Sequence, residues 1–536
     1  MKIKAVFLIV TVCIALLLLF SAQPFAKAAE AADDPCASLM DLKLPETKIL
    51  VAETLNAPDV RSSGVVIHGV WKTPKSAHGQ TTVSTNFCRV AGVVEPGINF
   101  EVWMPVEGWN GKFNGVGNGA LAGGINYPAM VAPLAKGYAV MSTDTGHQSE
   151  SIVDGAWMMG HPELWDDFGY RAMHMSTRNA KAVTEAYYGK APEYSYYTGC
   201  SGGGQEGLAE AQKYPADYDG IAVGAPANFP TRMWPGETYP GWVAFKAKTQ
   251  ESLGGPPGPP TVTPKLATLH EAALAACDEE DGVKDGVINA PLSCDFDPAT
   301  LLCPADPEDA NKCLTQAEVD TVKKIYAGLK DPTTGEQFWP GYAVGSEENW
   351  SGHIYPFVIP LGYFKAMVFD NPKWDYKSFN FESPKDFATL VEADARNAPY
   401  INATDPDLTA FNELGGKLLL WHGWADQNIA PQNSINYYNN VVDVVGEEAK
   451  TQEFMRLFMV PGMGHCGGGA GPTTFDALAA VEQWVENGTA PTELAGSHVT
   501  KSQVDYTRPI CMYPQVPQYS GSGSETDAAN FTCANP

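Results

Sequence analysis

A serine, an aspartate and a histidine follow one another along this chain in settings that suit nucleophilic catalysis. Ser201 lies in Gly-Cys-Ser-Gly-Gly, Asp426 in WHGWADQNIAP and His465 in VPGMGHCGGG. A serine hydroxyl becomes a nucleophile when a histidine takes its proton and a carboxylate orients that histidine. The three residue types, in this order, predict acyl transfer by a Ser201, Asp426, His465 triad.

The surroundings of Ser201 strengthen this prediction. A strand is expected at residues 194–199 and a helix at 205–214, so the serine would occupy a tight turn between them, where flanking glycines relieve crowding. Glycine-flanked serines are common in a chain with 52 glycines, so the strand-turn-helix context carries the argument. Asp426 and His465 likewise follow expected strands, at the sheet edge where such folds hold their sites.

Each partner also has a plainer interpretation. Asp426 could be the N-cap of a helix expected at 432–442. Any of five histidines could be a residue without a catalytic role, namely His147, His161, His174, His422 and His465. The required order, with each residue at a strand exit, favours the triad.

Two cysteines adjoin the expected triad. Cys200 precedes Ser201 and Cys466 follows His465, so a disulfide between them would tether the histidine loop to the nucleophile turn and restrict the unfolded chain. Cys200 could itself be the nucleophile, but it occupies the wrong position in the turn. For the oxyanion hole we expect the amides of Gly202 and Gly119, with Gly117 as second choice, although an ordinary glycine turn is the alternative at residues 113–124.

The elements that must position these residues form an α/β pattern. Up to about residue 227, apolar strands alternate with helices, at 100–106, 138–146, 170–188, 194–199, 205–214 and 219–227. Such alternation predicts a mostly parallel sheet covered by helices. From 228 to 407 the chain is rich in Pro, Gly, Trp and Cys, and the α/β pattern then resumes with strands at 415–423 and 454–460 and helices at 432–442 and 473–488. We expect one α/β domain, formed by 29–227 and 408–536, split by an inserted domain at 228–407.

The N-terminus predicts export. Lys2 and Lys4, an apolar run to Phe20 and an Ala-Lys-Ala site indicate a cleaved signal peptide at residues 1–28, with a retained membrane anchor as the alternative. The formal net charge of −27 disfavours nucleic acid and anionic membranes as partners. Ten cysteines remain after cleavage, and this even number predicts five disulfides in a secreted or periplasmic protein. Zinc is the competing interpretation, but the sequence contains no C-x2-C pair of the kind that binds it.

An acidic loop lies inside the insertion. Asp278, Asp281 and Asp285 stand between Cys277 and Cys294, and the glycine-containing loop lacks the residues of an EF-hand. With the carbonyls of Val283 and Val287, the three carboxylates could bind Ca²⁺, whereas a solvated acidic turn is the alternative.

Taken together, these motifs resemble the tannase and feruloyl esterase family, which includes mono(2-hydroxyethyl) terephthalate hydrolases. Matching stretches also include WNGKFNGVGNGALAGGI, DFGYRAMH and the tail from Cys511 to Cys533, so the resemblance covers nearly the whole mature chain. It implies an α/β-hydrolase fold with an inserted lid domain and a structural Ca²⁺ held by Asp278, Asp281, Val283 O, Asp285 and Val287 O. It also implies the disulfides Cys36–Cys88, Cys200–Cys466, Cys277–Cys294, Cys303–Cys313 and Cys511–Cys533.

The resemblance further implies a secreted serine esterase that acts on small aromatic esters or on ester-decorated plant polymers. The acyl group would be a ferulate, a gallate or a related benzoate, stacked on lid aromatics for which Tyr363, Phe364 and Trp374 are candidates. The same triad permits peptide or amide cleavage, and a non-catalytic, calcium-stabilised binding protein is an alternative from another class. The sequence does not choose the acyl group, the alcohol or the oligomeric state.

Overall fold

The computed structural model describes residues 34–57, 65–68, 80–256 and 261–536. The expected signal peptide at 1–28 lies outside these residues. None of the helices in the described part of the chain combines the length and the hydropathy that a membrane span requires.

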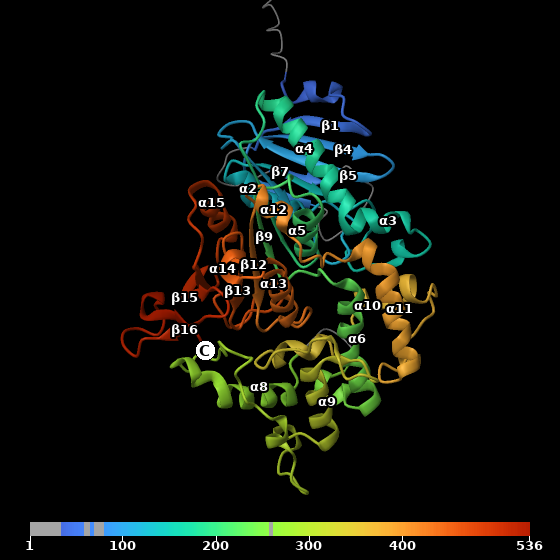
Figure 1. Ribbon diagram of the computed structural model, residues 1–536, viewed down its shortest axis with the longest axis vertical. Helices are drawn as coiled ribbons and strands as arrows, with labels where there is room; N and C mark the ends of the chain where they lie inside the picture. Colours follow the sequence, from blue (N-terminus) through green and yellow to red (C-terminus); the bar gives the residue numbers. More distant parts are fainter. Residues whose placement is uncertain (1–33, 58–64, 69–79, 257–260) are drawn as a thin grey trace, which may run out of the picture.

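A nine-stranded sheet forms the centre of the molecule (Figure 1). Its strands, in spatial order, are β1 (Thr47–Leu55), β4 (Phe87–Val94), β5 (Ile98–Pro105), β7 (Ala139–Thr143), β6 (Lys112–Val116), β8 (Tyr194–Cys200), β9 (Gly220–Gly224), β12 (Lys417–Gly423) and β13 (Met455–Val460). The pairs from β1 to β7 are antiparallel, and those from β7 to β13 are parallel. The parallel half brings the carboxyl ends of β8, β12 and β13 to one edge, where the three expected site residues follow.

Helices cover both faces of this sheet. One face packs on α4 (Ala172–Tyr188), α5 (Gly202–Lys213) and α13 (Gln432–Val445), and the other packs on α2 (Tyr127–Ala135) and α15 (Ala477–Asn487). Neighbouring strand residues alternate between the two layers, as Leu418 and Leu419 of β12 do. Burial on both faces explains why the central strands read as continuous apolar runs. The fold is the α/β-hydrolase arrangement that the sequence predicts.

A helical insertion separates β9 from β12. It contains α6 (Pro230–Ala247), α7 (Gln250–Gly254), α8 (Pro264–Cys277), α9 (Gln316–Ala327), α10 (Val358–Tyr363), α11 (Pro384–Ile401) and α12 (Thr409–Glu413), with a small hairpin of β10 (Leu329–Lys330) and β11 (Gln337–Trp339). Most of these helices lie below the sheet in Figure 1 and form hydrophobic clusters of their own. Helix α6 is buried along most of its length, although Pro235 and Pro240 lie inside it.

The C-terminal segment forms two hairpins, β14 (Glu493–Thr500) with β15 (Gln503–Cys511), and β16 (Val516–Tyr519) with β17 (Phe531–Ala534). A third hairpin pairs β2 (Val65–His68) with β3 (Gln80–Val83) near the N-terminus. The ten cysteines of the described residues form five disulfides, in the pairs that the family resemblance implies.

Candidate active site

Ser201 sits in a strained turn between β8 and α5. Its φ of 63° and ψ of −121° are unfavourable for a residue with a side chain. Hydrogen bonds on both sides hold this conformation, since the Ser201 amide donates to Gly224 O at 3.0 Å and its carbonyl accepts from Ala227 N at 2.9 Å. The turn therefore fixes the serine backbone at the end of β8 and the beginning of α5, which is the expected nucleophile geometry.

The glycines of this turn allow chains to approach closely. A Cβ on Gly199 would lie 2.5 Å from Gly203 O, and a Cβ on Gly203 would lie 2.8 Å from Asn118 O. Contacts this short exclude any side chain. The glycines that the sequence places around Ser201 are thus required by packing.

Asp426 and His465 meet at the ends of β12 and β13. His465 Nδ1 lies 2.8 Å from Asp426 Oδ2, in a setting where the aspartate is completely buried. An ionised carboxylate only accepts hydrogen bonds, so Nδ1 carries the proton and Nε2 of the neutral ring is left as an acceptor. This is the state in which a histidine can take a proton from a serine hydroxyl.

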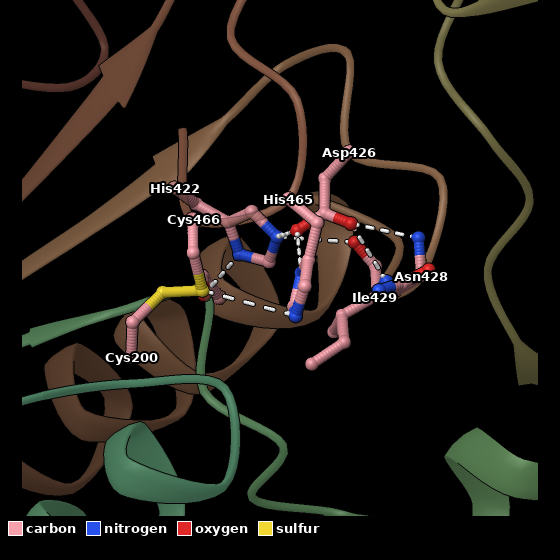
Figure 2. Close-up of a disulfide and its surroundings, with 8 residues drawn as sticks. Cys200, His422, Asp426, Asn428, Ile429, His465 and Cys466 are labelled. Atoms are coloured by element: carbon pink, nitrogen blue, oxygen red, sulfur yellow. Dashed lines mark hydrogen bonds and ion pairs between the residues drawn. A yellow bond between two sulfur atoms is a disulfide. The ribbon is translucent and has the colours of Figure 1, made fainter. Parts of the chain in front are cut away.

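Asp426 is held as a carboxylate by several donors. Its Oδ1 accepts from the amides of Asn428 at 2.8 Å and Ile429 at 2.9 Å (Figure 2). Burial acts to raise the pKa of Asp426, but the charge of His465 and hydrogen bonds from His422 and His465 outweigh it and lower that pKa below the usual 3.8. The plainer interpretation, a helix N-cap, is wrong, since the residue before α13 is Pro431 and no side chain caps that helix.

His422 is a partner of Asp426 that the sequence analysis left without a role. It belongs to β12, is fully buried, and places Nε2 3.1 Å from Asp426 Oδ2 and 3.0 Å from Ile429 O. Since both neighbours are acceptors, Nε2 carries a proton, and Nδ1 accepts from the Ser434 hydroxyl at 2.7 Å. The only sequence feature that could have indicated this contact is the spacing of four residues between His422 and Asp426.

The remaining candidate histidines lie away from Asp426. His161 is exposed beside Glu163, His174 pairs with Asp217, and His147 stacks on Trp157. Among these and His465, the structure thus brings only His465 to the carboxylate. Burial acts to lower the pKa of His465, but the charge of Asp426 and the hydrogen bond to it raise that pKa above the usual 6.5.

The Cys200–Cys466 disulfide joins the two halves of the site. It links β8 to the loop after β13 across a sequence separation of 266 residues, and Cys466 Sγ lies 3.8 Å from His465 Nε2 (Figure 2). Because Cys200 is bonded to Cys466, it carries no thiol and cannot be the nucleophile that the sequence analysis weighed against Ser201.

The glycine loop after β6 provides amides near the nucleophile. The Gly117 amide donates to Thr198 O at 2.9 Å and the Asn118 amide to Glu206 Oε2 at 3.1 Å, so neither is free for an oxyanion. Gly119 lines the same cavity as Ser201, and the position of a Cβ on Gly202 would be 3.5 Å from the Gly119 carbonyl carbon. Gly119 therefore remains a candidate, whereas Gly117, the second choice, does not.

A cavity of about 730 Å³ connects these groups. Ser201 and His465 lie in its wall, and the insertion contributes Met233, Trp234, Glu237, Phe357 and Ile359. The wall is mostly apolar, as is typical of a pocket for a small organic molecule.

The aromatic candidates from the sequence do not belong to this wall. Tyr363, Phe364 and Trp374 are packed inside the insertion, where the Phe364 and Trp374 rings stack with centroids 4.5 Å apart. The prediction that they stack on substrate is therefore wrong, because their faces are already used in the core. The aromatic residues that do line the cavity are Phe168, Trp234, Phe357, Trp421 and Phe475.

The acidic loop of the insertion folds against the C-terminal hairpin. Asp278 and Asp281 are buried, Asp278 accepts hydrogen bonds from amides of residues 285–287, and Arg508 Nη1 lies 2.9 Å from Asp285 Oδ2. Burial and the neighbouring carboxylates raise the pKa of Asp281 to about 6. Next to Asp281, the buried Asn289 Oδ1 has no hydrogen-bond partner among the described residues. Carboxylate and amide oxygens are the ligand types that a hard cation takes, and in this structure Arg508 supplies the positive charge beside Asp281 and Asp285.

Comparison with known proteins places these features in context. The family described as "Tannase and feruloyl esterase" matches residues 81–534. An uncharacterised esterase of Xanthomonas campestris is 35% identical, covering 93% of this chain and 91% of the relative, and a probable feruloyl esterase B-2 of Aspergillus terreus is 34% identical, covering 84% and 87%.

Solved structures show the same similarity. Feruloyl esterase B from Aspergillus oryzae superposes with a TM-score of 0.82 at 29% identity, covering 93% of this chain and 99% of that one. The tannin acyl hydrolase from Aspergillus niger gives a TM-score of 0.74 at 24% identity, covering 94% of each chain, which supports the fold.

Proposed function

Since the chain belongs to the tannase and feruloyl esterase family and is a carboxylic ester hydrolase, we propose that it cleaves esters of aromatic acids through an acyl-enzyme on Ser201. The observation that carries this proposal is the 2.8 Å contact between His465 Nδ1 and Asp426 Oδ2, beside the cavity that Ser201 lines. It supports a neutral histidine with a free Nε2 as the general base.

In the first step, His465 takes the Ser201 proton while the serine oxygen attacks the ester carbonyl. Asp426 stabilises the imidazolium that forms. The amides of Gly202 and Gly119 would bind the oxyanion, and His465 returns the proton to the leaving alcohol. The acyl-enzyme is then hydrolysed by water, which His465 activates in the same way.

The acyl group is the part of the substrate that this cavity suits best. Trp234 and Phe357 of the insertion form aromatic parts of the cavity wall. Aromatic surface of this kind suits a cinnamoyl or benzoyl ring. Relatives are named feruloyl esterases, and a neighbouring structure is a tannin acyl hydrolase. Ferulate, gallate and related hydroxybenzoate esters, free or attached to a plant polymer, are therefore the proposed substrates.

The protein would work outside the cytoplasm. Five disulfides within the described residues require an oxidising compartment to form and persist. Together with the expected signal peptide, they support secretion or a periplasmic location.

We also propose a structural Ca²⁺ at Asp278, Asp281, Asp285 and the carbonyls of Val283 and Val287. When bound, the ion would neutralise carboxylates that burial and mutual repulsion now disfavour. The loop lies against the C-terminal hairpin, so the ion would hold the insertion to the end of the chain.

The proposed function can be tested with Ser201→Ala. Wild-type protein should hydrolyse methyl ferulate or methyl gallate, and the variant should lose at least about 10³-fold in kcat, because no acyl-enzyme can form. A thermal unfolding curve like that of the wild type would show that the variant is folded. Unchanged turnover would contradict the mechanism, and cleavage of a peptide amide in preference to these esters would contradict the substrate class.

A terephthalate monoester completes this substrate screen. The described residues of the cavity wall include no lysine or arginine to neutralise its free carboxylate. We therefore expect it to be cleaved more slowly than either methyl ester.

A further inference from the structure

Glu237 is a carboxyl group in the wall of the cavity that the proposed mechanism does not use. It belongs to α6 of the insertion, is only 5% exposed, and shares the cavity with Ser201 and His465. The neighbouring lining residues of the same helix, Met233 and Trp234, are apolar.

The Glu237 side chain forms no hydrogen bond or ion pair with any residue of the described part of the chain. Buried Glu101 is paired with Arg89 at 2.7 Å and buried Glu318 with Lys265 at 2.6 Å, whereas Glu210 is also without a hydrogen-bond partner among the described residues but does not line the cavity. A buried polar group without a partner costs free energy, so an unpaired carboxyl in a cavity calls for a ligand that completes its hydrogen bonds.

The surroundings favour the neutral form of this carboxyl. Burial and the nearby charge of Asp426 raise the pKa of Glu237 well above its usual 4.5. Tyr342 lies close enough for the charge of Glu237 to affect its pKa, but its hydroxyl makes no hydrogen bond with any described residue. No lysine or arginine is among the described lining residues that could supply a counter-charge.

A neutral carboxyl has a distinct recognition chemistry. It offers one O–H donor and a carbonyl acceptor side by side, whereas an ionised carboxylate only accepts. A phenolic hydroxyl can both accept from and donate to such a group. A methoxy oxygen can only accept, and a ring hydrogen does neither.

The aromatic and apolar wall around Glu237 selects which part of the substrate it would meet. Trp234, Phe357 and Ile359 suit the ring of an acyl group better than a sugar or another polyol, whose hydroxyls would need several polar partners. We propose that Glu237 hydrogen-bonds a ring hydroxyl of the aromatic acyl group and so selects hydroxylated acids over their methoxylated or unsubstituted counterparts. This inference rests on the proposed function of the Ser201 site.

The test compares kcat/KM for three methyl esters, those of caffeic acid, 3,4-dimethoxycinnamic acid and cinnamic acid, which differ only at the ring positions. The wild type should prefer the caffeate ester by about 10- to 100-fold, since the cinnamate ester offers the Glu237 carboxyl no partner and the dimethoxy ester offers it only an acceptor. Methyl ferulate has one hydroxyl and one methoxy group, so its kcat/KM relative to the caffeate ester shows which ring hydroxyl Glu237 binds.

Two substitutions then separate hydrogen bonding from shape. Glu237→Leu should bring the ratio close to one, mainly by slowing caffeate hydrolysis, whereas Glu237→Gln should keep part of it, because an amide also donates and accepts. Lys246→Met is the control, since it changes a side chain of the same helix outside the cavity wall and should leave the ratio unchanged.

The outcomes separate the two proposals. A Glu237→Leu protein that hydrolyses the esters with the wild-type ratio would overturn the role of Glu237 and leave the esterase assignment intact. A wild type that hydrolyses none of the aromatic esters would overturn the proposed substrate class itself. If Glu237→Leu fails to fold, the isosteric Glu237→Gln variant decides, and an unchanged ratio with lower stability would mean a purely structural role.

Discussion

His422 Nε2 donates a hydrogen bond to Asp426 Oδ2 at 3.1 Å, inside the sheet edge that carries the site. The same oxygen accepts from His465 at 2.8 Å. Two histidines therefore share one carboxylate oxygen, and only His465 reaches the cavity. His422 is thus placed to position Asp426 and to reduce the negative charge that Asp426 offers to His465.

Replacing His422 should change the pH profile as well as the rate. In His422→Ala, Asp426 loses one donor, so more of its charge acts on His465 and the pKa of His465 rises. We expect the acidic limb of kcat/KM to move to higher pH and kcat to fall by about 10-fold, with KM little changed. Stopped assays across pH 5 to 9 measure both effects.

Ser434→Ala serves as the control for this variant. It removes the hydrogen bond to His422 Nδ1 and keeps the contact between His422 and Asp426, so its pH profile should stay near that of the wild type. If His422→Ala lowers kcat but leaves the acidic limb of the kcat/KM profile at the wild-type pH, His422 only supports packing.

The pH dependence of the wild type should follow His465. A general base acts when it is neutral, so activity increases as pH rises through the pKa of His465. Because Asp426 holds that pKa above 6.5, half-maximal kcat/KM should lie above pH 6.5. Asp426, with its lowered pKa, should add no limb near neutrality. A pH-rate curve that stays flat down to pH 5 would argue against His465 as the base.

The Cys200–Cys466 disulfide should affect stability and catalysis together. Its removal in Cys200→Ala/Cys466→Ala opens a loop of 266 residues, and the chain-entropy estimate for such a loop is about 5 kcal/mol. The His465 loop also loses its covalent tie to the Ser201 turn, so kcat should fall by 10-fold or more. Urea unfolding and initial rates measure the two losses.

The matched control is Cys303→Ala/Cys313→Ala. This pair lies in the insertion and spans 10 residues, which predicts a loss of about 3 kcal/mol at most with kcat preserved. If the Cys200/Cys466 variant loses stability but keeps full kcat, the disulfide does not position His465.

The proposed Ca²⁺ site predicts that removal of calcium destabilises the insertion. With EGTA, the unfolding midpoint should fall by several degrees and recover on addition of Ca²⁺ but not of Mg²⁺, because the site offers several oxygen ligands in an irregular loop. Asp281→Asn should weaken the response, and Asp297→Asn, an exposed residue of the same insertion, should leave it intact. Equal melting curves with and without EGTA would favour a simple acidic turn.

The sequence predicted the parts of the site that follow strand ends. Ser201, Asp426 and His465 were identifiable because parallel strands deliver their carboxyl ends to one edge. His422 was not, because it lies inside the buried strand β12, where a histidine gives no periodic signal and its partner is defined by the turn after it. The sequence pattern predicts a glycine loop at residues 113–116, but these residues belong to β6. Their strand conformation depends on pairing with β7 and β8, which are distant in sequence, so the local pattern could not predict it.

The insertion was the hardest part to predict. Helix α6 is buried on nearly every side, polar Thr231, Glu237 and Thr238 included, and it contains Pro235 and Pro240. It therefore shows neither the amphipathic period nor the composition of an ordinary helix. Glu237 could therefore not be assigned to a cavity wall, and Tyr363, Phe364 and Trp374 could not be recognised as core. Whether an aromatic residue faces a core or a pocket depends on tertiary packing alone.

The Cys200–Cys466 bond has one more consequence, for how this enzyme can diversify. Ser201 and His465 lie in loops at the sheet edge that this disulfide joins covalently. Trp234, Glu237 and Phe357, by contrast, belong to the helical insertion. If Glu237 selects the acyl group as proposed, mutations in that segment should change substrate preference while Ser201 and His465 keep their alignment. On this proposal, reactivity and selectivity belong to two different stretches of the chain.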